Sequence, residues 1–220
     1  MSTENQSVCA VVVAAGSSRR MGGENKLLLP LCGKPVLAHT LTAFQMCGAV
    51  RDIVLVCREQ DMEVYRTLAA ENGITKLRTL TRGGDTRTES VLAGVSAASE
   101  ACALVAVHDG ARPLVSDEVI TQAVDEAAKT GAAAPVVPVK DSIKRIENEK
   151  IAADVPRDTL AAVQTPQVFR RELLLDALQS AAASGRSFTD DCAAVEALGQ
   201  TVSATEGSYE NIKVTTPEDI

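Results

Sequence analysis

The stretch from Val8 to Val13 constrains the fold more than any other feature of the chain. Its residues, Val-Cys-Ala-Val-Val-Val, are all apolar, so a strand formed here would be apolar on both faces. Strands of this kind are typical of parallel sheets that are covered by helices on both sides. The run ends in the small residues Ala14, Ala15 and Gly16. We therefore expect a buried first strand whose carboxyl end opens into a small-residue loop.

Short β-branched runs then alternate with helical patterns, which indicates βαβ units and a mainly parallel sheet. Further strands are expected at Ile53–Cys57, Leu77–Thr81, Ala103–His108 and Ala133–Val137. Helices are expected between them at Pro35–Met46, Asp61–Asn72, Thr88–Ser99 and Ser116–Thr130. The last helix is the clearest, because Ser116 can cap its start and Gly131 can end it. The pattern predicts an α/β fold.

The segment from Val139 to Arg157 breaks this rhythm. Two short alternating strands, Ser142–Glu147 and Lys150–Val155, flank a turn at Asn148 and Glu149. A hairpin with so little apolar surface is not stable alone, so we expect a projecting arm that pairs with another chain. No repeat, linker or boundary is evident, so residues 1–220 are expected to form a single domain with the arm, 139–157, within it.

Four features are expected beyond the arm. They are an extended Thr165-Pro166-Gln167 segment, a helix near Arg171–Ser184, a helix capped by Thr189 and closed by Gly199, and a strand at Ile212–Val214. Pro217 is placed to open a terminal helix.

Charge and composition argue against several classes of protein. The chain has 220 residues, 22 Lys+Arg against 29 Asp+Glu, a net charge of −7 and only 2% aromatic residues. Polymeric nucleic acid is therefore an unsuitable partner, because its binding relies on basic surface and aromatic stacking. No apolar run approaches the roughly 18 residues of a membrane span, and residues 1–7 lack the pattern of a signal peptide. We expect a cytoplasmic protein with no membrane contact and with reduced cysteines, several of them buried.

The loop from Ala14 to Lys26 is the first candidate binding motif. Small residues at the end of a parallel strand let backbone N–H groups approach an anion, and Arg19, Arg20 and Lys26 add positive charge. The P-loop pattern G-x-x-x-x-G-K-[ST] is absent, and Ser18 replaces the second glycine of G-x-G-x-x-G. Two interpretations stay open, a polyphosphate site and a solvated glycine-rich turn.

The second candidate motif runs from Gly83 to Ser90, between a strand and a helix. Its glycines allow close approach of a ligand, while Asp85, Arg87 and Ser90 offer an acceptor, a forked donor and a hydroxyl. The alternative is ordinary capping of the helix by Thr86 or Thr88.

The third candidate motif, His108-Asp109-Gly110-Ala111-Arg112-Pro113, closes a strand. A carboxylate at such a strand end can hold a Mg²⁺ ion that bridges phosphates, although an aspartate there is also a common turn former. Neither His108 nor His39 has a serine or cysteine partner in a triad pattern, so nothing favours acyl-transfer hydrolysis.

Seven motifs in order carry a resemblance that spans Val8 to Ile220. They are 14–26, 83–90, 107–113, 134–145, 164–169, 189–191 and 211–215. Together they closely resemble the 2-C-methyl-D-erythritol 4-phosphate cytidylyltransferases of the non-mevalonate isoprenoid pathway. The resemblance implies a Rossmann-like nucleotidyltransferase fold, CTP and Mg²⁺ as co-substrate and cofactor, and a homodimer whose hairpin arms embrace.

The resemblance also assigns roles to individual residues. Ala14, Ala15, Gly16, Arg20 and Lys26 would line the triphosphate loop, and Gly84, Asp85, Arg87 and Ser90 would hold the cytidine side. Arg112 and Thr165 would stand near the nucleotide, Asp109 would hold the metal and face the substrate, and Ser142 and Arg157 would reach the methylerythritol phosphate in the partner's site. Arg20, Lys26 and Lys213 would be the catalytic cations.

Three other functions can be compared with the sequence. A cytidylyltransferase acting on ribitol 5-phosphate or another polyol phosphate would differ mainly in the arm and near Lys213. A nucleotide-diphosphosugar glycosyltransferase would normally carry an Asp-x-Asp-like pair, which His108-Asp109-Gly110 lacks. A non-catalytic nucleotide-binding regulator would have no need to keep the cations and Asp109 together.

Overall fold

The computed structural model describes residues 7–16, 25–186 and 188–220. A central eight-stranded sheet has the order β10-β7-β11-β6-β1-β4-β5, with β12 paired to β7. Its strands are β1 (Val8–Val13), β4 (Val50–Cys57), β5 (Leu77–Arg82), β6 (Leu104–Asp109), β7 (Ala132–Pro138), β10 (Ala161–Val163), β11 (Gln167–Arg170) and β12 (Ser203–Glu206). The two-residue strands β2 (Pro30–Leu31) and β3 (Lys34–Pro35) pair separately.

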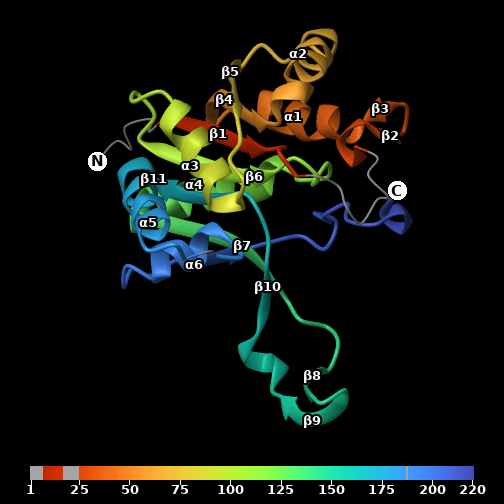
Figure 1. Cartoon of the computed structure of the whole chain (residues 1–220), viewed down its shortest axis with the longest axis vertical. Helices are drawn as coiled ribbons and strands as arrows, with labels where there is room; N and C mark the ends of the chain where they lie inside the picture. The colour runs from red at the N-terminus through yellow and green to blue at the C-terminus, as the bar shows by residue number, and fades with distance from the viewer. Residues whose placement is uncertain (1–6, 17–24, 187) are drawn as a thin grey trace.

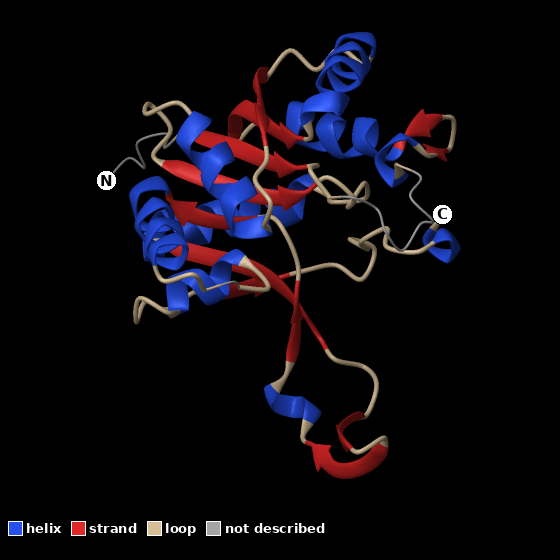
Figure 2. Cartoon of the chain, viewed as in Figure 1, coloured by secondary structure: helices blue, strands red, loops and turns tan. Residues whose placement is uncertain are grey.

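Helices cover both faces of this sheet (Figures 1 and 2). They are α1 (Val36–Met46), α2 (Met62–Glu71), α3 (Arg87–Ala97), α4 (Asp117–Thr130), α5 (Arg171–Ala183) and α6 (Asp191–Glu196). Short 3-10 helices lie at η2 (Lys26–Leu28), η3 (Glu59–Asp61), η4 (Arg157–Thr159) and η5 (Pro217–Asp219). The mixed α/β architecture confirms the predicted class.

The strand β1 lies at the centre of the sheet and faces two separate cores. Val8, Ala10 and Val12 pack into the core under α1, α2 and α4, whereas Cys9 and Val11 pack into the core with α3, α5 and α6. All five side chains are 0% exposed, which explains why the first strand carries no polar residue.

The direction of the chain around β1 sets where a ligand can bind. The strand pairs in parallel with β4 on one side and with β6 on the other, and β4 continues in parallel to β5. The chain therefore runs outward from β1 to β5 and then crosses back to β6. In open α/β sheets such a switch point leaves a crevice at the carboxyl ends of the strands.

The predicted local signals of α4 are confirmed. The Ser116 hydroxyl accepts a hydrogen bond from the backbone N of Val119 at 3.3 Å, and Gly131 takes a left-handed φ of 96° that ends the helix. Two other expectations are wrong. Asp190, not Thr189, caps α6, since its Oδ1 accepts from the N of Ala193. No strand forms at 212–214, because Ile212 and Lys213 are exposed and Val214 N bonds instead to the Ala111 carbonyl.

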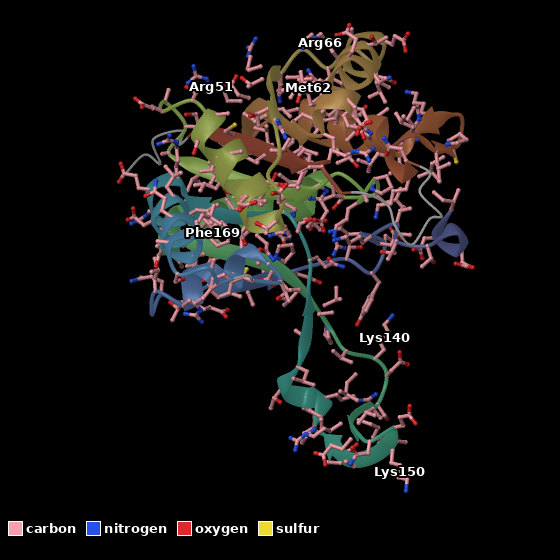
Figure 3. All side chains as sticks on the ribbon, viewed as in Figure 1. Arg51, Met62, Arg66, Lys140, Lys150 and Phe169 are labelled. Atoms are coloured by element: carbon pink, nitrogen blue, oxygen red, sulfur yellow. The ribbon has the colours of Figure 1, made fainter. Side chains whose placement is uncertain are left out.

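The expected hairpin is present between β7 and β10. Its strands β8 (Ile143–Glu147) and β9 (Lys150–Val155) form their own antiparallel sheet, joined by Asn148 and Glu149 at positive φ of 49° and 63°. Such angles suit a tight two-residue hairpin turn. The hairpin projects away from the body, with Lys140 near its base and Lys150 at its far end (Figure 3).

Two further expectations concern the state of the cysteines and the presence of membrane-spanning helices. All six cysteines are free, five of them buried and Cys32 exposed. Over the described ranges, no helix has both the length and the apolar character required to cross a bilayer.

Candidate active site

A cleft of about 750 Å³ opens at the switch point. It is built from the residues that follow β1, β4, β5 and β6, together with the segment near 213–215. Its lining residues are Val13, Ala15, Gly16, Lys26, Leu27, Arg58, Gly84, Asp85, Thr86, Arg87, Ser90, Asp109, Lys213 and Thr215. Residues from all three candidate motifs therefore line one cleft, because the carboxyl ends of parallel strands lie at the same edge of the sheet.

Two carboxylates line this cleft, the exposed Asp85 and the more buried Asp109. The Oδ2 of Asp109 lies 2.8 Å from Lys213 Nζ and 3.5 Å from Arg112 Nε, and its side chain is 13% exposed. Burial alone would raise the pKa of Asp109, but Lys213, Arg87 and Arg112 outweigh that effect and lower the pKa to about 2. The carboxylate is thus ionised throughout the neutral range.

A hydrogen-bonded chain fixes the backbone that carries Asp109. The N–H of Asp109 donates to Thr165 Oγ1 at 3.2 Å, and this hydroxyl lies 3.0 Å from His108 Nδ1. His108 Nε2 lies 3.2 Å from the Arg112 carbonyl, which can only accept, so Nε2 carries the proton and Nδ1 accepts from Thr165. Burial lowers the pKa of His108 to about 4, so the ring is neutral and structural.

Residues 211–214 are tied to the same loop. Arg112 donates to the Asn211 carbonyl at 2.6 Å, and Val214 N donates to the Ala111 carbonyl at 2.8 Å. Lys26 Nζ in turn donates to the Val214 carbonyl at 2.7 Å. These contacts bring Lys26 and Lys213, which are far apart in sequence, to the cleft that holds Asp109.

The Gly83–Ser90 motif caps a helix and also contributes residues to the cleft. Thr86 caps α3 in a capping box with Glu89, and Ser90 Oγ accepts from Gly84 N at 3.1 Å. A Cβ at Gly84 would lie 2.3 Å from the Cβ of Glu89, so only glycine fits here. Gly84, Asp85 and Ser90 nevertheless also line the cleft.

Arg87 lines the cleft but is held by a partner that the sequence did not reveal. Its guanidinium makes a bidentate pair with Asp191, at 2.8 and 2.7 Å, and the Asp191 side chain is only 1% exposed. Burial raises the pKa of Asp191, although Arg87 opposes that effect. The pair joins α3 to α6 and makes Arg87 a rigid part of the wall.

The remaining predicted residues lie in other places. Ala14 is buried and its N donates to the Val56 carbonyl, and Arg112 and Thr165 support Asp109 without being among the lining residues. Arg20 lies outside the described residues. Ser142 and Arg157 belong to the arm, where Arg157 donates to the Lys140 carbonyl and lines a second cavity of about 680 Å³.

Sequence reasoning missed Arg58 and Thr215 as lining residues. Arg58 follows β4 directly, so its place at a strand end was the signal that could have found it. Thr215 is the last residue of the 211–215 motif, and no role was assigned to it.

The donor set suits Mg²⁺ held together with substrate phosphates. No group of three or more potential ligands gathers among the described residues, so the protein forms no closed metal cage there. Asp109 supplies one ionised carboxylate in the cleft, and both of its cation contacts fall on Oδ2. Mg²⁺ commonly binds through one or two carboxylates plus phosphates, so these residues fit the ion.

Known proteins resemble the chain along nearly its whole length. The family model described as 2-C-methyl-D-erythritol 4-phosphate cytidylyltransferase matches residues 8–220. A curated protein of that name from Halalkalibacterium halodurans is 46% identical over 211 residues, 96% of this chain and 92% of that protein. Another from Dehalococcoides mccartyi is 42% identical over 217 residues, covering 98% and 94%.

Solved structures agree with the sequence matches. The crystal structure of 4-diphosphocytidyl-2C-methyl-D-erythritol synthase from Anaerococcus prevotii superposes with a TM-score of 0.88 at 28% identity, covering 99% of this chain and 94% of that one. The 2-C-methyl-D-erythritol 4-phosphate cytidylyltransferase from Thermus thermophilus gives a TM-score of 0.77 at 33% identity, covering 96% and 94%. The chain belongs to the 2-C-methyl-D-erythritol 4-phosphate cytidylyltransferase family.

Proposed function

We propose that this chain transfers CMP from CTP to 2-C-methyl-D-erythritol 4-phosphate, giving 4-diphosphocytidyl-2-C-methyl-D-erythritol and pyrophosphate in isoprenoid precursor synthesis. The observation that carries the proposal is the cleft at the switch point, where Lys26 and Lys213 lie with Asp109 in a member of this family. A cleft of about 750 Å³ is a suitable size for a nucleotide.

The reaction needs little acid–base help from the protein. A phosphate monoester has a second pKa of about 6, so the substrate phosphate is mostly a dianion at pH 7. One of its oxygens attacks the α-phosphorus of CTP, and the bond from that phosphorus to the bridging oxygen breaks, so that pyrophosphate leaves with the electron pair. This scheme agrees with the neutral, fully buried His108, which is in no position to act as a base.

The residues of this chain position the reactants and neutralise charge. Lys26, from η2, and Lys213, from the 211–215 motif, would contact the reacting phosphates. Arg20 would assist them. Gly84, Asp85 and Ser90 would hold the cytidine, and Arg87 would keep their loop in place through Asp191. Fixed donors at developing negative charge are worth about 10² to 10³ in rate in comparable enzymes.

Mg²⁺ is proposed as the cofactor, held by Asp109 and the phosphates of CTP. When bound, it would neutralise negative charge on the triphosphate. The carboxylate is suited to the task because its pKa is lowered to about 2, so it does not need to lose a proton first.

A homodimer is proposed through the arm. The β8–β9 sheet is separate from the central sheet, and its Ile146 and Ile151 are 60% and 70% exposed, an apolar pair that a second arm could cover. Ser142 and Arg157 would then reach the polyol phosphate in the partner's cleft. A cytoplasmic location is proposed with it, supported by the free thiols, which suit a reducing compartment.

Pyrophosphate release tests the proposed function directly. The chain is assayed with CTP and Mg²⁺ against 2-C-methyl-D-erythritol 4-phosphate, ribitol 5-phosphate and a panel of other polyol phosphates. We expect the highest kcat/KM with the methylerythritol substrate. A preference for ribitol 5-phosphate would reassign the substrate, and no turnover with any acceptor would favour a regulator.

A further inference from the structure

The buried phenol of Tyr65, outside the cleft, is hydrogen-bonded to Asn25, the residue that precedes Lys26. Tyr65 of α2 is 0% exposed and heads the fully buried side chains by size. A buried tyrosine hydroxyl requires a hydrogen-bond partner. Here the partner lies 40 residues earlier in the chain, since Asn25 Nδ2 donates to Tyr65 Oη at 2.9 Å. The hydroxyl also lies 3.3 Å from Asn25 Oδ1, to which it can donate.

Asn25 in turn is the N-cap of η2. Its Oδ1 accepts from the backbone N of Leu27 at 3.2 Å, and its carbonyl accepts from Leu28 N at 2.9 Å. Leu27 is 4% exposed and anchors the turn in the core under α1 and α2. Lys26 stands between this cap and this anchor, so the orientation of the Asn25 amide sets the direction in which Lys26 leaves the backbone.

We propose that Tyr65 is a positioning residue for Lys26: its hydroxyl holds the Asn25 amide, and Asn25 fixes the turn that presents Lys26 to the cleft. Neither Tyr65 nor Asn25 is among the residues that line the cleft, so the effect runs through Lys26 and its contact with the Val214 carbonyl. Burial raises the pKa of Tyr65 to about 12, although the bond to Asn25 opposes this, so the phenol keeps its proton at neutral pH.

The first test measures the reactivity of Lys26 and does not depend on turnover. The chain and Tyr65→Phe are treated with limiting acetic anhydride, and acetylation of each lysine is followed by mass spectrometry. Lys76 is the matched control, because its Nζ also donates to a carbonyl, that of Cys47, at 2.7 Å. We expect Tyr65→Phe to speed acetylation of Lys26 severalfold and to leave Lys76 unchanged. Equal rates at Lys26 in both proteins, or parallel rises at both lysines, would overturn the proposal.

The second test rests on the proposed function and separates the cap from the phenol contact. Asn25→Ser keeps an oxygen that can cap Leu27 but is too short to reach Tyr65. We expect Asn25→Ser and Tyr65→Phe each to lower kcat about 10-fold, since misplacement by about 1 Å can cost about 10²-fold. The KM for the polyol phosphate should change by less than about twofold. The double variant should be no slower than either single one, because both substitutions break the same contact.

Two outcomes would contradict this second expectation. Wild-type kcat in Asn25→Ser would show that the cap alone positions Lys26, and multiplied losses in the double variant would show two separate routes. Ile120→Val, a conservative change in the same core on α4, controls for a general loss of stability and should leave kcat unchanged. If the unmodified chain shows no turnover, the proposed function fails while the acetylation result still decides the role of Tyr65.

Discussion

The cleft and the arm differ in how deeply their charged side chains are buried. At the cleft, Asp109 pairs with Lys213 and Arg87 pairs with the buried Asp191, while Arg112, which supports Asp109, donates to the Asn211 carbonyl. On the arm, Lys144 pairs with Asp154 across two exposed strands, and the apolar Ile146 and Ile151 face solvent. The cleft is therefore preorganised within one chain, whereas the arm is a surface that would be completed by a second chain.

Breaking the Arg87–Asp191 pair should have the largest effect on the rigid half of this comparison. Asp191→Ala leaves the Arg87 guanidinium without its buried partner. Removing one partner of a buried ion pair typically lowers the free energy of unfolding by about 3–5 kcal/mol. We expect that reduction in the free energy of unfolding, measured in urea. Glu63→Ala, which removes the exposed partner of Arg66, is the control and should shift stability by no more than about 0.5 kcal/mol. Equal effects of the two variants would contradict a rigid cleft wall.

Removal of the Lys26 ammonium should abolish most turnover without unfolding the chain. Lys26→Ala is expected to lower kcat by about 10² to 10³, or about 2.7–4 kcal/mol of transition-state stabilisation. Pyrophosphate release measures the loss, and circular dichroism checks the fold. Lys129→Ala, on an exposed face of α4, should be silent in both measurements. An unchanged kcat in Lys26→Ala would remove this residue from the mechanism.

Acid should loosen the loop that holds Asp109. The pKa of His108 is lowered from 6.5 to about 4 in the folded chain, so the unfolded chain takes up the proton first as the pH falls. Stability is then complete above pH 6.5 and is lost progressively down to pH 4, by about 3 kcal/mol. The lowered pKa of Asp109 adds a further loss between its ordinary 3.8 and about 2. Urea unfolding at several pH values gives the free energy of unfolding as a function of pH. Between pH 6.5 and 4 this free energy should fall less steeply in His108→Gln than in the unmodified chain. An equally steep fall in both would exclude His108 as the cause.

Substitutions on the arm should have the smallest effect on the body. Ile146→Ser combined with Ile151→Ser is expected to change the free energy of unfolding of the monomer by less than about 0.5 kcal/mol, because both side chains are largely exposed. Sedimentation velocity should instead show dissociation of the proposed dimer. A dimer of undiminished affinity would mean that other surfaces hold the two chains together.

Local signals predicted the parts of the fold that depend on short stretches of sequence. The apolar run of β1 and the Ser116 and Gly131 boundaries of α4 each lie within a few residues, and all three are confirmed. By contrast, the β12 sequence Ser-Ala-Thr-Glu has no alternation of apolar and polar residues, and the strand is held by its pairing with β7. The strand expected at 212–214 does not form, because Val214 is the one buried residue of the three and a single buried side chain does not hold a segment in a sheet.

The candidate site divides in the same manner. Asp109 and the Gly83–Ser90 loop were predicted to lie in the site because polar residues at the carboxyl ends of parallel strands meet at one edge of the sheet. Two contacts that support the cleft were not predicted, because Asp191 lies on a different helix from Arg87 and Tyr65 lies 40 residues after Asn25. Such long-range pairs leave no periodicity or spacing for sequence reasoning to detect.

The tie between residues 211–214 and the loop after β6 has a consequence for chain synthesis. Asp109 leaves the ribosome long before Lys213, so the unfinished chain holds a carboxylate that still lacks its nearest cation. Translation that terminates before Lys213 would yield the strands β1 to β12 without this cation or the Val214 carbonyl that receives Lys26. It follows that the proposed triphosphate site would be completed only after residues 213 and 214 have been synthesised, so fragments that end before Lys213 would bind CTP more weakly than a chain that contains both residues.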